Sequence, residues 1–150
     1  MVIFNRSHYE AVLVERVHGL IPKKTWLRRY KDIEHFEHLL HEDHTVIMKF
    51  FLHIDKAEQR RRLEERLNDP SKQWKLSLAD AQERRFWSKY MRAYERALQS
   101  TSRDSSLWYV IPSNKKWFRD LVVSSIIVET LEELGMKYPK ASVDLKSISL

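Results

Sequence analysis

Basic side chains gather in the middle of the chain, in a pattern that favours the binding of phosphate groups. A helical stretch from Asp55 to about Leu67 interleaves arginines with glutamates, and two lysines and a tryptophan follow the break at 69–70. The candidate binding residues of this region are Arg60, Arg61, Arg66, Lys72, Trp74 and Lys75. Guanidinium and ammonium groups pair with phosphate oxygens, and an indole ring can stack on a nucleotide. The alternatives are a solvated helix face with pairs to nearby glutamates, and a core position for Trp74.

A second cationic position, Arg6, comes shortly after the apolar run Val2–Phe4. This run predicts the end of a buried strand. Open parallel sheets bind ligands at the carboxyl ends of their strands, so the guanidinium of Arg6 is placed to pair with phosphate oxygens. The alternative for Arg6 is a structural salt bridge.

The composition excludes several kinds of chemistry. A chain without cysteine has no disulfide, no thiolate metal site and no cysteine nucleophile. Only two glycines occur, Gly19 and Gly135, so there is no Gly-rich loop to cradle phosphates. The net charge of +6 favours a polyanionic partner without specifying which one. With no apolar run of about 20 residues and no leader pattern, we expect a soluble, unexported, cytoplasmic protein without membrane contact.

Two further patterns carry less weight. Four histidines recur every third residue between His35 and His44, but steps of three spiral around a helix, so we favour a solvated face and assign no metal ligand. The basic and aromatic stretch 23–31 could contact a nucleic acid, yet no recognised RNA or DNA module accompanies it. Nucleic acid is therefore not the expected partner.

The scaffold for these residues is predicted to be an α/β fold. Besides residues 2–4, strands are expected over 45–54 and 107–112, where β-branched and aromatic residues cluster. Helices are expected over 8–17, 25–42, 56–67, 77–98 and 116–134, with Ser7, Thr25 and Ser77 as N-caps and Gly135 after the last helix. Strands alternating with helices indicate a parallel sheet with helical crossovers, and 150 residues fit one domain.

Several blocks of sequence occur in an order that a known family shares. They are Ile3-Phe4-Asn5-Arg6-Ser7-His8-Tyr9, Lys49-Phe50-Phe51-Leu52-His53-Ile54, Glu58-Gln59-Arg60-Arg61-Arg62-Leu63, Asp69-Pro70 with Lys72-Gln73-Trp74-Lys75, Arg84 with Trp87, and Trp108-Tyr109-Val110-Ile111-Pro112 with Lys116-Trp117. In these blocks the chain resembles the polyphosphate kinase type 2 family over roughly residues 2–139. Because the Gly-rich loop of that family is missing, the resemblance covers only part of the family domain.

The resemblance implies a P-loop kinase-like, three-layer α/β/α fold with a parallel sheet and a helical lid over about residues 56–90. It also implies that the fold is incomplete at its N-terminal side. Residues 1–139 would form a partial polyphosphate kinase type 2 domain, and residues 140–150 a C-terminal tail.

The activity implied by the resemblance is phosphoryl transfer between inorganic polyphosphate and ADP/ATP or AMP, with Mg²⁺ as cofactor and a homo-oligomer as assembly. Arg6, Asn5 and Arg84 would be the catalytic residues. Asn5 stands where many members carry an aspartate that organises magnesium, and an amide offers no charge to the cation. Without its own P-loop, the chain is expected to be incomplete and not fully active alone. The alternative function is a non-catalytic module that binds a polyanion, either polyphosphate or nucleic acid.

Overall fold

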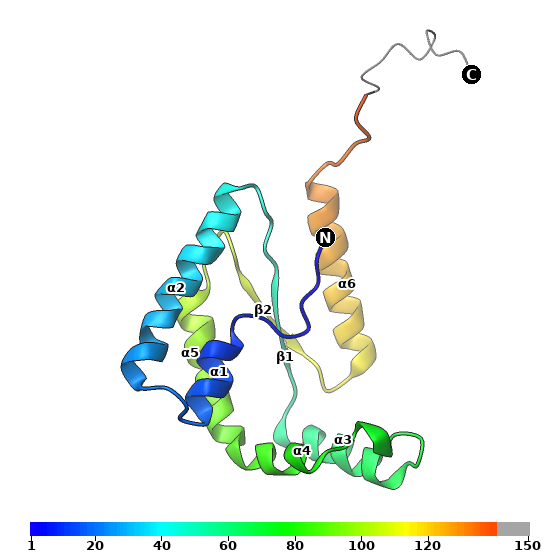
Figure 1. Cartoon of the computed structure of the whole chain (residues 1–150). Helices are drawn as coiled ribbons and strands as arrows, with labels where there is room; N and C mark the ends of the chain where they lie inside the picture. Colours follow the sequence, from blue (N-terminus) through cyan, green and yellow to red (C-terminus); the bar gives the residue numbers. More distant parts are fainter. Residues whose placement is uncertain (141–150) are drawn as a thin grey trace, which may run out of the picture.

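The computed structural model describes residues 1–140, so nearly all of the expected tail lies outside the described residues. Within that part, helices and strands alternate as an α/β fold requires (Figure 1). In chain order they are α1 Glu10–Val17, α2 Lys23–Glu42, β1 Lys49–His53, α3 Lys56–Asn68, α4 Leu78–Glu83, α5 Trp87–Thr101, β2 Trp108–Pro112 and α6 Lys116–Glu133. Short 3-10 turns, η1 Gln73–Lys75 and η2 Arg84–Phe86, precede α4 and α5.

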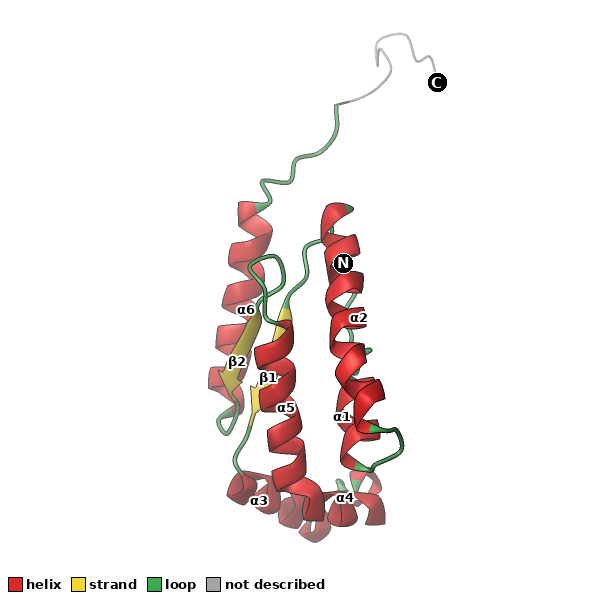
Figure 2. Ribbon diagram, turned by 90° about the vertical axis from the view of Figure 1, so that its left-hand side faces the viewer, coloured by secondary structure: helices red, strands yellow, loops and turns green. Residues whose placement is uncertain are grey.

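The two strands form a parallel pair, which confirms the predicted class. Lys49 lies opposite Trp108 and His53 opposite Pro112, so the strands are in register from end to end. The helices between β1 and β2 make the long crossover that parallel strands need. Helices α1, α2 and α5 lie on one side of the strands and α6 on the other, while α3 and α4 cross the lower end of the molecule (Figures 1 and 2). This lower element, residues 56–86, covers most of the stretch 56–90 where a lid is expected, and it is called the lid below.

The core lies where α1, α2 and α5 meet. Its buried residues are Tyr9, Val12, Leu13, Val17, Tyr30, Ile33, Ala93 and Ala97. The two alanines of α5 let α1 approach closely, and the ring of Phe51 in β1 stacks on Tyr94 of α5 at 4.6 Å between centroids. The helical layer is thereby joined to the sheet.

The predicted strand at residues 2–4 is wrong. The structure gives this run no strand, and Val2, Ile3 and Phe4 are 72–79% exposed. A β-strand needs a neighbour to satisfy its backbone groups, and within residues 1–140 β1 pairs only with β2. The β-propensity of the run is therefore not sufficient to make it a strand here.

Helix starts differ from the sequence patterns in two places. Tyr9 and Pro22 are the N-caps of α1 and α2, so the expected caps Ser7 and Thr25 are wrong. Ser77 does cap α4, and it forms a reciprocal capping box with Asp80. The single helix expected over 77–98 is divided by η2, where Phe86 packs against the core while α4 stays in the lid.

Candidate functional site

A hollow of about 240 Å³ opens where β1 and β2 end. The residues that line this carboxyl-edge hollow are His53, Asp55, Pro112, Ser113, Asn114, Lys115 and Phe118. Both strands point their carboxyl ends at it, which is the edge where open α/β sheets bind ligands. The lining offers an aromatic ring, an ammonium group and hydrogen-bonding side chains, a combination suited to a charged ligand with an apolar part. The sequence reasoning did not single out these residues, although the strand-end rule points to 53–55 and 112–115.

Asp55 and Asn114 hold the start of the lid against the loop after β2. The Asn114 amide donates to Asp55 Oδ2 at 2.6 Å, and the Asp55 backbone N–H donates to Asn114 Oδ1 at 3.1 Å. The other carboxylate oxygen of Asp55 caps α3 by accepting from the Glu58 N–H at 2.7 Å. The hydrogen bonds from the Glu58 backbone and then from Asn114 lower the pKa of Asp55. The hollow is therefore bridged by an ionised carboxylate and its amide partner.

The lid arginines are engaged with glutamates of their own helix. Arg60 donates to Glu64 at 2.6 Å, and Arg61 forks onto Glu58 at 2.7 and 2.8 Å. The expected alternative of glutamate pairs is thus present in the structure. Arg60 and Arg61 remain exposed and keep further N–H groups for a ligand, so their predicted binding role stays a prediction.

Arg62 and Arg66 differ from these two. Arg62 donates to the carbonyl of Ser113 at 2.7 Å, which ties α3 to the rim of the hollow. Arg66 is half-buried and forms no ion pair or side-chain hydrogen bond to any residue between 1 and 140. The arginine cluster therefore comprises the anchoring Arg62, the exposed Arg60 and Arg61, and the half-buried Arg66 without a side-chain partner in residues 1–140.

Glu58 makes the lid helix sensitive to acid. Hydrogen bonds from Arg61 and then Arg62 lower the pKa of Glu58 to about 2. A carboxyl with a lowered pKa stabilises the fold above its ordinary value near 4.5, and this contribution is lost as the pH falls to about 2. We expect the amide NMR signals of α3 to shift across that interval in the natural chain and to shift less in E58Q, where Asp55, whose pKa is also lowered, still caps the helix. In E64Q the step due to Glu58 should persist, because the Glu64 carboxylate pairs only with Arg60; its loss there would contradict the assignment to Glu58.

The η1 region presents an exposed indole beside an ammonium group. Trp74 is 78% exposed, which excludes the core position considered for it, and the Lys75 Nζ lies 4.9 Å from its ring centroid. Lys72 Nζ instead pairs with Glu65 at 2.7 Å and Asp69 at 2.9 Å, and these contacts raise the pKa of Lys72 to about 12. Trp74 and Lys75 form no side-chain hydrogen bond or ion pair within residues 1–140, whereas Lys72 is engaged in two ion pairs; the binding role of all three stays a prediction.

The residues expected to be catalytic are not gathered in one place. Arg84 donates through one nitrogen to the Lys56 carbonyl and the Gln59 side chain, both at 2.8 Å, and so binds η2 to the first turn of α3. Arg6 is 76% exposed and pairs with Glu10 at 3.2 Å, which is the salt bridge considered for it. Asn5 is exposed beside it. Arg84 thus belongs to the lid, and within residues 1–140 Arg6 makes no hydrogen bond or ion pair to the lid.

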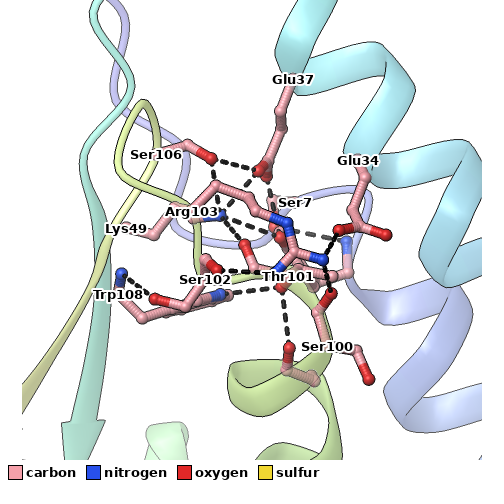
Figure 3. A network of polar contacts seen from close by, with 12 residues as sticks. Ser7, Glu34, Glu37, Lys49, Ser100, Thr101, Ser102, Arg103, Ser106 and Trp108 are labelled. Atoms are coloured by element: carbon pink, nitrogen blue, oxygen red, sulfur yellow. Dashed lines mark hydrogen bonds and ion pairs between the residues drawn. The ribbon is translucent and has the colours of Figure 1, made fainter.

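A buried ion pair that sequence reasoning missed joins α2 to β1 (Figure 3). Lys49 Nζ is 2.6 Å from Glu37 Oε2, and the two side chains are 6% and 2% exposed. The sequence did contain a sign of both residues. Lys49 is a charge at the start of an apolar strand, and Glu37 falls on the apolar face of α2, four residues after Ile33.

The described residues do not by themselves form a metal cage. Among residues 1–140, no group of three or more His, Asp and Glu side chains converges on one point, the histidines of α2 included. The amide oxygen of Asn5 is neutral, and the carboxylate of Asp55 already accepts two hydrogen bonds. These donors do not fit a magnesium site built by the chain alone. The same part of the chain has no helix with the length and apolarity to cross a bilayer.

Comparison with known proteins accounts for this arrangement. The chain is 54% identical to the AMP/ADP-polyphosphate phosphotransferase of Meiothermus ruber over 140 residues, which are 93% of this chain and 52% of the relative. It is 44% identical to the ADP-polyphosphate phosphotransferase of Rhodopseudomonas palustris, again over 93% of this chain and 53% of the relative. The chain thus spans about half the length of these curated relatives.

The fold and the family model agree with these relatives. The crystal structure of polyphosphate kinase 2 from Arthrobacter aurescens TC1 superimposes with a TM-score of 0.92 at 44% identity, covering 96% of this chain and 51% of that one. The expected P-loop kinase-like α/β fold is thereby confirmed. The model of the family described as polyphosphate kinase 2 matches residues 1–139. The chain therefore belongs to the polyphosphate kinase 2 family.

Proposed function

We propose that the chain is the lid-bearing part of a phosphotransferase that moves phosphoryl groups between inorganic polyphosphate and ADP/ATP or AMP. The observation that carries the proposal is the carboxyl-edge hollow, bordered by a lid with outward-facing cationic side chains, in a member of this family. The names of the relatives include both AMP and ADP as nucleotides.

The chemistry of phosphoryl transfer suits these side chains. The reaction depends mainly on aligning two anionic partners and neutralising their charge, and it requires no cysteine or serine nucleophile. Arg60, Arg61 and Arg66 would bind phosphates from the lid, while Trp74 would stack on the base with Lys75 beside it. Arg84 would keep the lid facing the hollow. Magnesium, for which residues 1–140 form no cage, would arrive on the phosphates of the nucleotide with its own water ligands.

The decisive experiment measures ATP formation from ADP and polyphosphate with Mg²⁺. It compares this chain with a form extended by the part of its relatives' length that the chain does not span. We expect the extended form to be active and the chain alone to be inactive or nearly so. Inactivity of both, with no binding of ADP or polyphosphate, would reject the proposal.

A second candidate is a module that binds polyphosphate without turnover. Both glycines of the described part follow the C-terminal ends of helices, so neither belongs to a phosphate-cradling loop, while the lid carries the exposed cations Arg60, Arg61 and Lys75. This function predicts saturable binding of polyphosphate to the 150-residue chain, no ATP formation, and weak competition by DNA or RNA.

We further propose that the chain self-associates through its exposed N-terminal run. Val2, Ile3 and Phe4 are 72–79% exposed, and within residues 1–140 one edge of β1 has no strand beside it. Light scattering after size-exclusion chromatography should show a dimer or larger species, and I3K should shift it toward monomer. The control L78K changes a side chain that is 87% exposed in the lid, and it should leave the assembly unchanged. A compact monomer of the natural chain would contradict this prediction.

A further inference from the structure

The carboxylate of Glu37 joins chain segments that are far apart in the sequence. Its Oε2 accepts from Lys49 Nζ at 2.6 Å and from Ser106 Oγ at 3.0 Å, and its Oε1 accepts from the Tyr9 hydroxyl at 2.8 Å. These partners come from the start of β1, the loop before β2 and the start of α1. In Figure 3, Glu37 and Lys49 point toward each other with Ser106 beside them.

Lys49 completes the cluster from the sheet side. Besides Glu37, its ammonium donates to the Thr101 carbonyl at the end of α5, at 2.7 Å. Among the described residues no buried side-chain nitrogen or oxygen is left without a partner. Burial alone would raise the pKa of Glu37, but hydrogen bonds from His8, Lys49 and Tyr9 outweigh it and lower that pKa. Glu37 is therefore an ionised carboxylate held away from water.

A buried ion pair of this kind contributes little net stability. Removing two charges from water is costly, and apolar residues of the same size often stabilise a core equally well. A buried pair instead fixes geometry, because each of its hydrogen bonds holds the partner group at a defined position.

The part held in place is the segment that carries Arg6. Residues 2–6 belong to no helix or strand, and within residues 1–140 the side chain of Arg6 pairs only with Glu10, the first residue of α1. Tyr9 is 3% exposed, and its ring packs edge-on against Trp108 at 4.9 Å. Backbone hydrogen bonds extend this anchor toward Arg6. The N–H of Glu10 donates to Ser7, which is next to Arg6, and the N–H groups of residues 11 and 12 donate to residues 8 and 9.

From this geometry we propose that Glu37 is a positioning residue, which acts through Tyr9 and Lys49 to fix the Asn5–Arg6 segment relative to the strands that end at the hollow. Lys49 begins the strand that ends at His53, so the same carboxylate holds both the segment and the strand. The effect on phosphoryl transfer rests on the proposed function. The position of the Asn5–Arg6 segment does not depend on that function.

Two tyrosines of the core provide a matched test. Tyr9 and Tyr30 are both 3% exposed, and each has a hydrogen-bonded hydroxyl, but Tyr30 bonds to Arg16 and not to Glu37. Y9F and Y30F each remove one buried hydroxyl and keep the ring. The chain has no natural cysteine, so spin labels at I3C and V110C can report the distance between the N-terminal segment and β2.

Electron–electron double resonance, on labelled chain diluted into excess unlabelled chain so that distances within one copy are read, should give the narrower distance distribution in the natural chain and in Y30F. It should give a broadened one in Y9F and in the apolar double variant E37L/K49M. In the extended, active form, Y9F should reduce kcat/KM about tenfold, because small misplacements of a charge-neutralising group are costly, while Y30F should change it little.

Equal distributions in Y9F and Y30F would overturn the positioning role, whatever the activity. The double variant covers the case in which Y9F is too unstable to measure, because it keeps an apolar core but removes the carboxylate. Broadening confined to Y9F and E37L/K49M, in a protein that neither binds polyphosphate nor forms ATP, would reject the proposed function and leave the positioning role standing.

Discussion

Replacing Lys49 with methionine should lower the free energy of unfolding by about 3–5 kcal/mol, because it leaves the carboxylate of Glu37 buried without its counter-charge. The side chain of Glu37 is 2% exposed and keeps only neutral donors from Tyr9 and Ser106, with His8 Nε2 at 3.5 Å. Urea denaturation at neutral pH measures the change. If K49M shows no cooperative unfolding transition, the loss is at least as large as the free energy of unfolding of the natural chain.

Two comparisons show whether the uncompensated charge is the cause. The double variant E37L/K49M should recover most of the loss, because it removes both charges and fills the space with apolar atoms. R60M breaks an exposed pair, because the side chains of Arg60 and Glu64 are 70% and 52% exposed, and it should cost no more than about 1 kcal/mol. A K49M variant as stable as the natural chain would contradict the buried pair.

Replacing Arg84 with methionine should weaken polyphosphate binding about tenfold, an effect of the size expected when a charged hydrogen-bond donor is lost. The guanidinium of Arg84 fastens η2 to the Lys56 carbonyl and to Gln59, so its loss frees the lid as well as removing a positive charge. Calorimetric titration at constant ionic strength measures the affinity.

The adjacent residue gives a control for net charge. R85M removes the same charge from an exposed side chain that forms no hydrogen bond or ion pair within residues 1–140. It should weaken binding no more than about twofold, as a screened surface charge does. Equal losses in R84M and R85M would mean that charge alone matters and that the contact with α3 does not.

Local patterns predicted most of the elements but not all of their limits. The apolar runs gave β1 and β2, and the 3.6-residue periodicity gave the helices, because these signals depend on side chains a few positions apart. Val2–Phe4 carries the same local signal as β1, yet it forms no strand, because pairing requires a neighbour that local sequence does not describe. The η2 break was missed for a similar reason, since it depends on Phe86 packing against the core.

The site shows the same division more sharply. Arg60, Arg61, Trp74 and Lys75 were predicted as binding residues from residue type, and the structure leaves all four exposed, so this role stays a prediction. Arg6 and Arg84 were also predicted as site residues; a salt bridge was considered for Arg6, but the contacts of Arg84 were not foreseen. The bond from Arg84 to α3 joins residues 25 positions apart, and no periodicity encodes it.

The sequence by itself determined the family, the α/β class and the lid as a cationic element, because ordered motifs and side-chain chemistry can be read from neighbouring residues. Only the tertiary structure decided that the ends of β1 and β2 enclose a hollow and that Glu37 meets Lys49, Tyr9 and Ser106. Those partners lie 12, 28 and 69 residues from Glu37 in the chain. The physical reason is that burial and hydrogen bonding act between groups that folding brings together, whatever their separation in sequence.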